Sequence, residues 1–351
     1  IVSPIHAEEN GRGDYARPQL VLPDEFRWFS LSEKIAAGGG EEKTAQRKRN
    51  PYDDLIESVH WEDAGKGRLA TVLVKPELEK KHSGRHRGGG AKPMMVPIVR
   101  TTAKFSKPAN SFRVIHDELA QRIKREGGLI AELNNALIES YTNAYRSMAF
   151  HSDMALDLDE GTTIALYSCY KNPGRAPPRV LVVQAKRSDE AGDGTTDNSE
   201  PETFEIPLVH DSVVTFSVDT NRRFRHKIVL PKGELPDNQW LGVTFRTSKT
   251  FVRYLSGERD DGKVLLESGE ELSLLPDEKR SDFYKMRGRE NREVNFKYPT
   301  GLCTTISRSD LMQPMEPPEV MTTKDSGAAH SRLKKRESPE RRQGEANKRQ
   351  C

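Results

Sequence analysis

Short apolar runs and alternating apolar and polar residues predict that most of this chain folds into β-strands. Residues 69–74 are apolar and partly β-branched and stop before Pro76, as expected of a strand. The other predicted strands cover residues 58–61, 94–105 (a buried strand followed by a loop), 136–141, 148–153, 162–169, 180–183, 204–208, 212–218, 227–230 and 241–245. So many short strands, separated by turn residues, are typical of an antiparallel barrel or a double-sheet jelly roll.

One stretch follows a helical period instead. Its apolar residues are Phe112, Ile115, Leu119 and Ile123. Ser111 is a suitable N-cap, and Gly127 and Gly128 supply a stop signal. We therefore expect an amphipathic helix that packs on a sheet.

Polar stretches divide the chain. Residues 1–50 are rich in Gly, Glu and Arg and are expected to be flexible, apart from an apolar island at 26–29 that docks on the body of the protein. Residues 187–203 are expected to form a disordered insertion, and residues 257–351 a charged, largely disordered C-terminal region. A single folded domain at 51–256 remains, mainly β with flanking helices.

Composition supports this division and narrows the class of protein. Of 351 residues, 34% are hydrophobic and 31% charged, which is poor in apolar residues for a fully globular chain. The net charge of +3 does not by itself indicate a nucleic-acid partner. The three cysteines lie far apart without a CxxC pair, which argues against a zinc knuckle or disulfide framework and favours a reducing compartment.

No apolar run approaches the length of a membrane span, so we expect an intracellular protein, in nucleus or cytoplasm, with no membrane partner. The basic clusters at 334–336 and 341–342 fit a nuclear localisation signal, a phosphate-binding tail or plain solvated disorder.

The candidate chemistry begins at His151 and Asp153. Two residues apart on a strand, they face the same side. A third ligand would complete a 2-His-1-carboxylate face, the arrangement that leaves positions open on Fe(II). His82 and His86 have a suitable spacing for a helical site, but glycines around them favour a solvated basic loop.

Downstream of Asp153, the third ligand is either His210 or His226. A strand that ends in Arg246 follows His226, and Arg binds a carboxylate with a planar fork of donors. A hairpin from His226 would bring Arg246 beside the metal, whereas from His210 an extra strand would intervene. We therefore favour His226.

In this order, Tyr141, His151/Asp153, His226 and the strand end 244–246 (Thr-Phe-Arg) resemble the AlkB-like Fe(II)/2-oxoglutarate-dependent dioxygenases. Residues 135–141 are similar to that family's N-x-x-L-x-N-x-Y stretch, and the resemblance covers about 94–252. It implies a double-stranded β-helix (jelly-roll) core with a catalytic iron on His151, Asp153 and His226. It also implies O₂ and 2-oxoglutarate as cosubstrates, the latter held through its carboxylates by Tyr141 and Arg246.

Three positions depart from the family pattern. Glu139 stands where the family often has Asn, Trp240 where it usually has a second Arg, and Met154 where an acidic residue often contacts a methylated base. Lys227, Lys249 or Arg225 would supply the missing charge, or Arg246 would act alone. The resemblance thus supports binding of iron and 2-oxoglutarate better than it supports the repair of alkylated bases.

The resemblance implies an oxidoreductase that hydroxylates or oxidatively demethylates its substrate and converts 2-oxoglutarate to succinate and CO₂. An alkylated nucleic acid base is one such substrate, and the basic stretches at 85–87, 222–227 and 332–349 are compatible with phosphate contacts. The alternatives are a dioxygenase acting on protein side chains or a small molecule, and a catalytically silent jelly-roll binding protein.

Overall fold

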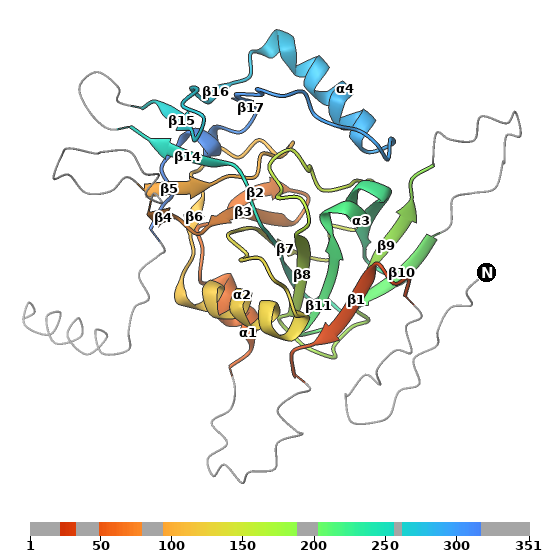
Figure 1. The fold of residues 1–351 in the computed structure, drawn as a ribbon. Coiled ribbons are helices and arrows are strands. Elements are labelled where there is room, and N and C mark those ends of the chain that lie inside the picture. The colour runs from red at the N-terminus through yellow and green to blue at the C-terminus, as the bar shows by residue number, and fades with distance from the viewer. Residues whose placement is uncertain (1–21, 33–48, 79–93, 188–202, 256–261, 317–351) are drawn as a thin grey trace, which may run out of the picture. The chain divides into compact units, whose positions relative to one another are not determined.

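The computed structural model describes residues 22–32, 49–78, 94–187, 203–255 and 262–316 (Figure 1). The basic stretch with His82 and His86, nearly all of the polar insertion at 187–203 and the basic tail lie outside these residues. Within the described part of the chain, no helix is long and apolar enough to cross a membrane.

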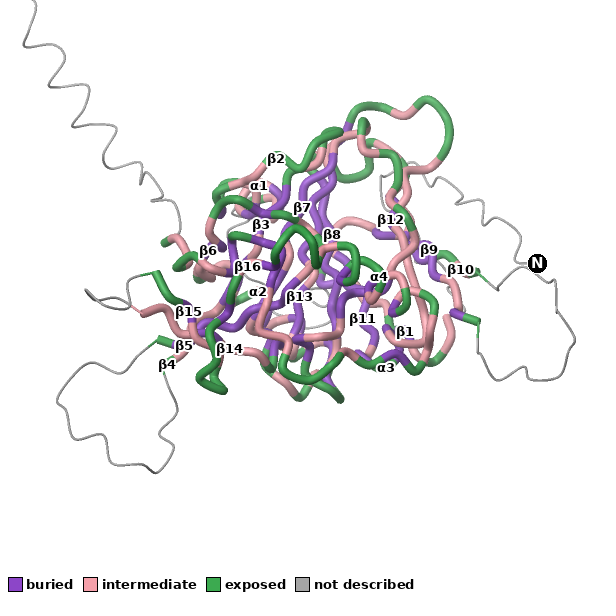
Figure 2. The backbone as a smooth tube through the Cα atoms, turned by 90° about the horizontal axis from the view of Figure 1, so that it is seen from above, coloured by how far each residue is buried: buried purple, intermediate pink, exposed green. Residues whose placement is uncertain are grey.

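The described residues are mainly β, in sheets that are mostly antiparallel. The largest sheet has eight strands in the order β1-β11-β8-β13-β7-β3-β2, with β6 paired to β3. Its strands are β1 (Phe26–Ser30), β2 (Glu62–Gly65), β3 (Arg68–Val74), β6 (Asn110–Ser111), β7 (Asn135–Tyr141), β8 (Thr163–Tyr170), β11 (Ser212–Ser217) and β13 (Trp240–Arg246). The central strands β7, β8 and β13 are buried along almost their whole length because both faces of the sheet are covered (Figure 2).

A three-stranded sheet packs on one of these faces. Its order is β10 (Thr203–Leu208), β9 (Arg179–Ala185) and β12 (Phe224–Val229). Leu181 and Val183 of β9 pack with Leu166 of β8 in the core between the sheets. Side chains two apart on β9 share this inner face, so Arg179 points inward as well.

Two helices cover the other face of the large sheet (Figure 1). They are α1 (Pro51–Ile56) and α2 (Val114–Gly127). Ile123 of α2 is completely buried, and Gly128 ends the helix in the left-handed conformation, as predicted. Ser111 is not its N-cap, since it belongs to β6, and the backbone of Arg113 caps the helix instead.

Most predicted strands are confirmed, with two errors. Residues 58–61 are not a strand, because Ser58 closes the last turn of α1 by donating to the carbonyl of Leu55. Residues 148–153 make only isolated bridges, at His151 and at neighbouring Ser147. The segment with His151 and Asp153 is therefore irregular backbone, tied down by specific contacts rather than by a ladder.

The expected hairpin between His226 and Arg246 is also wrong. His226 lies on β12 of the small sheet and Arg246 on β13 of the large sheet, and the two strands do not pair. The connection between them crosses from one sheet to the other.

The C-terminal region is more ordered than predicted, up to residue 316. Its elements include β15 (Val264–Leu266), β16 (Ser273–Leu274), α4 (Arg280–Glu290) and β17 (Thr304–Thr305), and they follow β14 (Phe251–Tyr254) of the predicted domain. β14 and β15 extend a small sheet with β5 (Met94–Pro97) and β4 (Glu77–Leu78). Leu275, Phe283 and Ile306 of this segment are buried in a cluster with Met154, and Val264 and Leu272 in another cluster with Val252, which composition alone does not reveal. The apolar island at 26–29 docks on the body of the protein, as predicted, because β1 pairs with β11.

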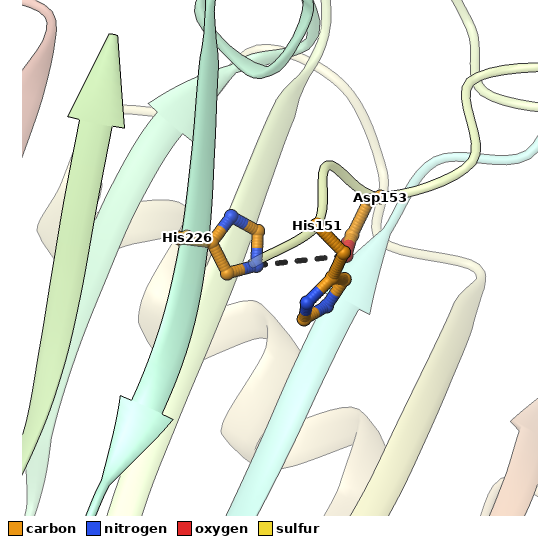
Figure 3. A group of neighbouring side chains, drawn as sticks. All are labelled: His151, Asp153 and His226. Carbon is orange, nitrogen blue, oxygen red and sulfur yellow. Dashed lines mark ion pairs between the residues drawn. The ribbon is translucent and has the colours of Figure 1, made fainter. Parts of the chain in front are cut away.

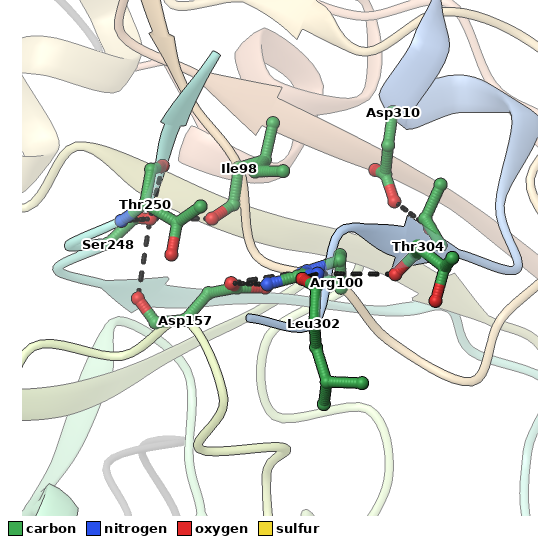
Figure 4. A network of polar contacts seen from close by, with 9 residues as sticks. Ile98, Arg100, Asp157, Ser248, Thr250, Leu302, Thr304 and Asp310 are labelled. Atoms are coloured by element: carbon green, nitrogen blue, oxygen red, sulfur yellow. Dashed lines mark hydrogen bonds and ion pairs between the residues drawn. The ribbon is translucent and has the colours of Figure 1, made fainter. Parts of the chain in front are cut away.

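A buried polar network joins this segment to the core (Figure 4). Arg100 and Asp157 form an ion pair with 2.7 Å between Nη2 and Oδ1, and the Arg100 Nη1 donates to the carbonyls of Leu302 and Thr304. Removing one partner of such a pair costs about 3–5 kcal/mol, because the other charge is left buried and uncompensated. Asp310 lies in the same region and accepts a hydrogen bond from the Thr305 hydroxyl at 2.5 Å.

Burial raises the pKa of Asp310 to about 7, from an ordinary value of 3.8. A raised pKa in the folded state stabilises the fold below the unfolded pKa, and this stability is lost as pH rises through the folded pKa. We expect the free energy of unfolding to fall by up to about 1.4 kcal/mol per pH unit between pH 4 and 7 from this group. Thermal unfolding of the wild type and Asp310→Asn at pH 5 to 8 tests this; parallel pH profiles would contradict it.

Candidate metal centre

His151, Asp153 and His226 converge at a cavity between the two sheets (Figure 3). One ligand atom from each residue lies within 4.8 Å of the others, and no other group of this kind occurs in the described part of the chain. The cavity has a volume of about 350 Å³. Two imidazole nitrogens and one carboxylate oxygen on one side of a site suit a divalent transition metal with open positions.

The two histidines face each other across an antiparallel bridge. Each backbone N–H donates to the carbonyl of the other residue, at 2.9 Å and 2.7 Å, and the ring centroids are 4.7 Å apart. The His151 Nδ1 lies 3.1 Å from the carbonyl oxygen of Ala149. Because a carbonyl only accepts, Nδ1 carries the proton and Nε2 is left as the metal ligand.

Asp153 is fixed by partners from two elements. Arg246 of β13 donates to its Oδ2 at 2.8 Å, while Oδ1 lies 3.8 Å from the His226 Nε2. Asn221 of α3 (Val218–Arg223) holds the backbone N–H and carbonyl of Asp153, both at 2.8 Å. One carboxylate oxygen is thus bound by Arg246, and the other faces the histidines.

The charges of the site favour metal-binding protonation states. Burial alone would raise the pKa of Asp153, but the charge and the hydrogen bond of Arg246 hold it below its ordinary range. Burial, with a smaller contribution from His151, lowers the pKa of His226 to about 3. The carboxylate is therefore ionised and His226 neutral near pH 7, the forms in which both bind metal.

The two predicted cosubstrate residues lie at different depths. Arg246 lines the cavity, whereas Tyr141 does not and packs against the tilted rings of Tyr145 and Trp240, whose centroids lie 4.4 and 4.7 Å from its own. The Tyr141 hydroxyl is buried without a hydrogen-bond partner, and burial raises its pKa well above the ordinary value.

None of the three cations expected to replace the second Arg lines this cavity. Arg225 and Lys227 lie over the ring of Phe150, at 5.4 and 4.4 Å from its centroid, and Lys249 lines a different cavity. An ion pair that the sequence did not suggest is present instead: the Arg68 Nε donates to Glu139 at 2.7 Å, and both side chains line the cavity.

Sequence reasoning also missed Arg179 and Arg287. Arg179 is 1% exposed, and its guanidinium lies 5.3 Å from the centroid of the Tyr141 ring. Its position two residues before Leu181 on a predicted apolar strand is a signal that could have placed it inside. Arg287 reaches the cavity from α4, and no local pattern indicates that.

A larger cavity of about 520 Å³ lies beside β14, β15 and residues 290–302. Its lining mixes acidic residues such as Glu267 and Glu293 with basic residues such as Arg222 and Lys297. It contains no metal-ligand group among the described residues, so the smaller cavity is the better candidate for chemistry.

Comparisons with known proteins leave the family open. The sequence matches no family model and no curated protein. A solved structure described as "The structure of OsALKBH1" aligns with 54% of this chain and 100% of its own, at 11% sequence identity and a TM-score of 0.29. A similarity at this level assigns neither a fold nor an activity.

The metal site makes a direct prediction. The purified protein should bind one Co(II) per chain, with visible absorption bands from the bound ion. Asp153→Ala and His226→Ala should weaken binding by more than the roughly 10–100-fold typical of a lost outer-shell partner. His60→Ala, at an exposed histidine, is the matched control. Equal binding by Asp153→Ala and the wild type would contradict the assignment.

Proposed function

We propose that this protein is an Fe(II)- and 2-oxoglutarate-dependent dioxygenase of the AlkB-like kind. The observation that carries the proposal is the convergence of His151, Asp153 and His226, three residues that the sequence singled out, at one cavity inside a two-sheet β core. The packing of the β10-β9-β12 sheet on the large sheet supports a double-stranded β-helix as the core.

The donor set fits Fe(II). Two imidazoles and one carboxylate would hold the ion from one side, which would leave positions for a cosubstrate and O₂. When bound, iron with 2-oxoglutarate would supply the oxidation of a substrate C–H bond. The protein would orient the ligands: Ala149 sets the His151 tautomer and Arg246 turns the Asp153 carboxylate.

Arg246 fits one carboxylate of 2-oxoglutarate because it is a buried cation on the cavity wall next to the metal ligands. Tyr141 fits the second carboxylate because its buried hydroxyl has no partner, and an unpaired buried donor is costly unless a ligand satisfies it.

The second carboxylate also needs a cation, and Arg179 is suited to supply it. Trp240, which stands where the resemblance implies this cation, has a neutral side chain. Its indole lies over Gly242, where any larger side chain would clash with it. Arg179 faces Tyr141 from the opposite sheet and donates to the carbonyls of Tyr145 and Thr142, each at 2.8 Å. The described residues include no carboxylate paired with it.

Two further unpaired atoms lie in the same patch. The Trp240 Nε1 and the Ser168 Oγ are both buried without a partner, and Ser168 is directly opposite Gly242 in the sheet. Three partnerless donors beside an arginine without a carboxylate fit an anion better than an apolar ligand.

The substrate we propose is a molecule with an oxidisable C–H bond, such as an alkylated nucleic acid base. Met154, in place of the acidic residue, is buried against the C-terminal segment. Protein side chains and small molecules therefore stay as alternative substrates, and the silent binding protein as the alternative without catalysis.

A turnover assay distinguishes a dioxygenase that acts on nucleic acid from one that acts on another substrate, and both from a silent binding protein. With Fe(II), 2-oxoglutarate and O₂, the protein should form succinate, and His151→Ala and Asp153→Ala should abolish this reaction. Methylated single-stranded oligonucleotides should release formaldehyde where unmethylated ones do not. Succinate without formaldehyde would point to another substrate class. Metal binding without any succinate would favour the silent protein.

The carboxylate site is tested by binding, without turnover. Trp240→Phe and Ser168→Ala each remove one donor, worth about 1.5–3 kcal/mol when the acceptor is charged, so the dissociation constant for 2-oxoglutarate should rise about 10–100-fold. Calorimetry with Mn(II) in place of iron measures this. Trp28→Phe, at another buried indole without a partner, should have no effect. Unchanged affinity in both test variants would exclude this end of the site.

A further inference from the structure

Residues at the C-terminal end of α4 form hydrogen bonds with the backbone of residues 152–155, in the loop that carries His151 and Asp153. The Asn291 Oδ1 accepts from the Ser152 N–H at 3.0 Å, and the Arg287 Nη2 donates to the Ser152 carbonyl, also at 3.0 Å. The Glu290 Oε1 accepts from the Ala155 N–H at 2.8 Å. These three bonds bracket Asp153 on both sides.

Two of the three residues, Arg287 and Glu290, are buried and are themselves held by other side chains. The side chains of Arg287 and Glu290 are 9% and 7% exposed and form an ion pair. The Tyr298 hydroxyl donates to the Glu290 Oε2 at 2.5 Å, and Lys186 donates to the Glu290 carbonyl at 2.6 Å. Burying charged groups costs free energy unless they are paired. This set of buried and paired groups is therefore a specific contact of the fold rather than a chance contact at the surface.

The loop needs such support because it belongs to no ladder. Backbone bonds from His226 fix His151, and Asn221 fixes the peptide groups of Asp153. Nothing in the large sheet holds the backbone at Ser152 or Ala155 among the described residues; their N–H groups bond to α4 and the segment that follows its last residue. The orientation of the Asp153 side chain therefore depends on the contacts of the loop with His226 and Asn221 and also on its contacts with the end of α4.

An apolar contact anchors the helix. Phe283, on the first half of α4, packs with Met154, the residue directly after Asp153. Helix and loop thus meet through both apolar and polar groups. More than 120 residues of chain separate them, so the contact forms only in the folded protein.

We propose that Arg287, Glu290 and Asn291 form a positioning clamp: they hold residues 152–155 so that the Asp153 carboxylate faces His226, and thereby set the metal affinity of the site. The inference rests on the metal centre of the proposed function. It assigns a role to the C-terminal segment that the ligands themselves do not imply.

Co(II) binding to the full chain tests the clamp. Asn291→Leu removes the acceptor for Ser152 at nearly constant volume, and Glu290→Leu removes the acceptor for Ala155. Each should raise the dissociation constant for Co(II) about 10–100-fold, as loss of an outer-shell partner typically does. The Co(II) absorption bands should also shift, because the ligand geometry changes.

Two variants serve as controls. Glu290→Gln keeps an oxygen that accepts from Ala155 and should restore most of the affinity. Arg289→Ala lies on the same helix but on its exposed side, paired with Glu293, and should bind Co(II) like the wild type. Replacing Glu290 also breaks its buried ion pair with Arg287, so Asn291→Leu, which leaves that pair intact, distinguishes loss of the clamp from a general loss of stability.

The outcomes are distinct. Weak, spectrally shifted binding in both Leu variants, with rescue by Glu290→Gln, supports the clamp. Wild-type affinity in Asn291→Leu and Glu290→Leu overturns it, as does a loss of affinity that Arg289→Ala shares. If the wild type itself binds no Co(II), the proposed metal site fails first and the clamp falls with it.

Discussion

The ion pair between Asp153 and Arg246 is the interaction on which the site depends. It is almost fully buried, with side chains 7% and 6% exposed, and it joins an irregular loop to the large sheet. The same loop is bridged to β12 of the small sheet through His151. The loop therefore connects both sheets, and removing either charge of the ion pair would leave the other buried and uncompensated, at a cost of about 3–5 kcal/mol.

This pair also explains how a polar cluster persists in an apolar interior. Leu166, Leu181 and Phe216 line the cavity around it, and each buried polar group needs a specific partner. Arg246 balances Asp153 and Arg68 balances Glu139, so charges of opposite sign are matched where they meet. Tyr141, Ser168 and Trp240 are exceptions, since each has a buried donor without a partner, and a polar ligand would complete the pattern there.

The C-terminal segment is part of this arrangement rather than an appendage. Arg100 and Asp157 attach residues 302–304 to the core, and α4 contacts the metal loop a few residues before Asp157. The order of the segment comes from two small hydrophobic clusters and many directed polar bonds. Such bonds stabilise a segment only where the partners already have fixed positions.

The sequence by itself predicted the mainly β class and helix α2 from apolar periodicity, which is a local signal. It also singled out His151, Asp153 and His226, which the structure brings together as a candidate metal site. It did not determine that β12 and β13 lie in different sheets, since turn residues do not say which strand pairs with which. Nor did it indicate that Arg179 faces Tyr141 or that Asn291 holds Ser152. Those contacts join residues far apart in the chain, and only the packing of two sheets and a late helix around one loop brings them within bonding distance.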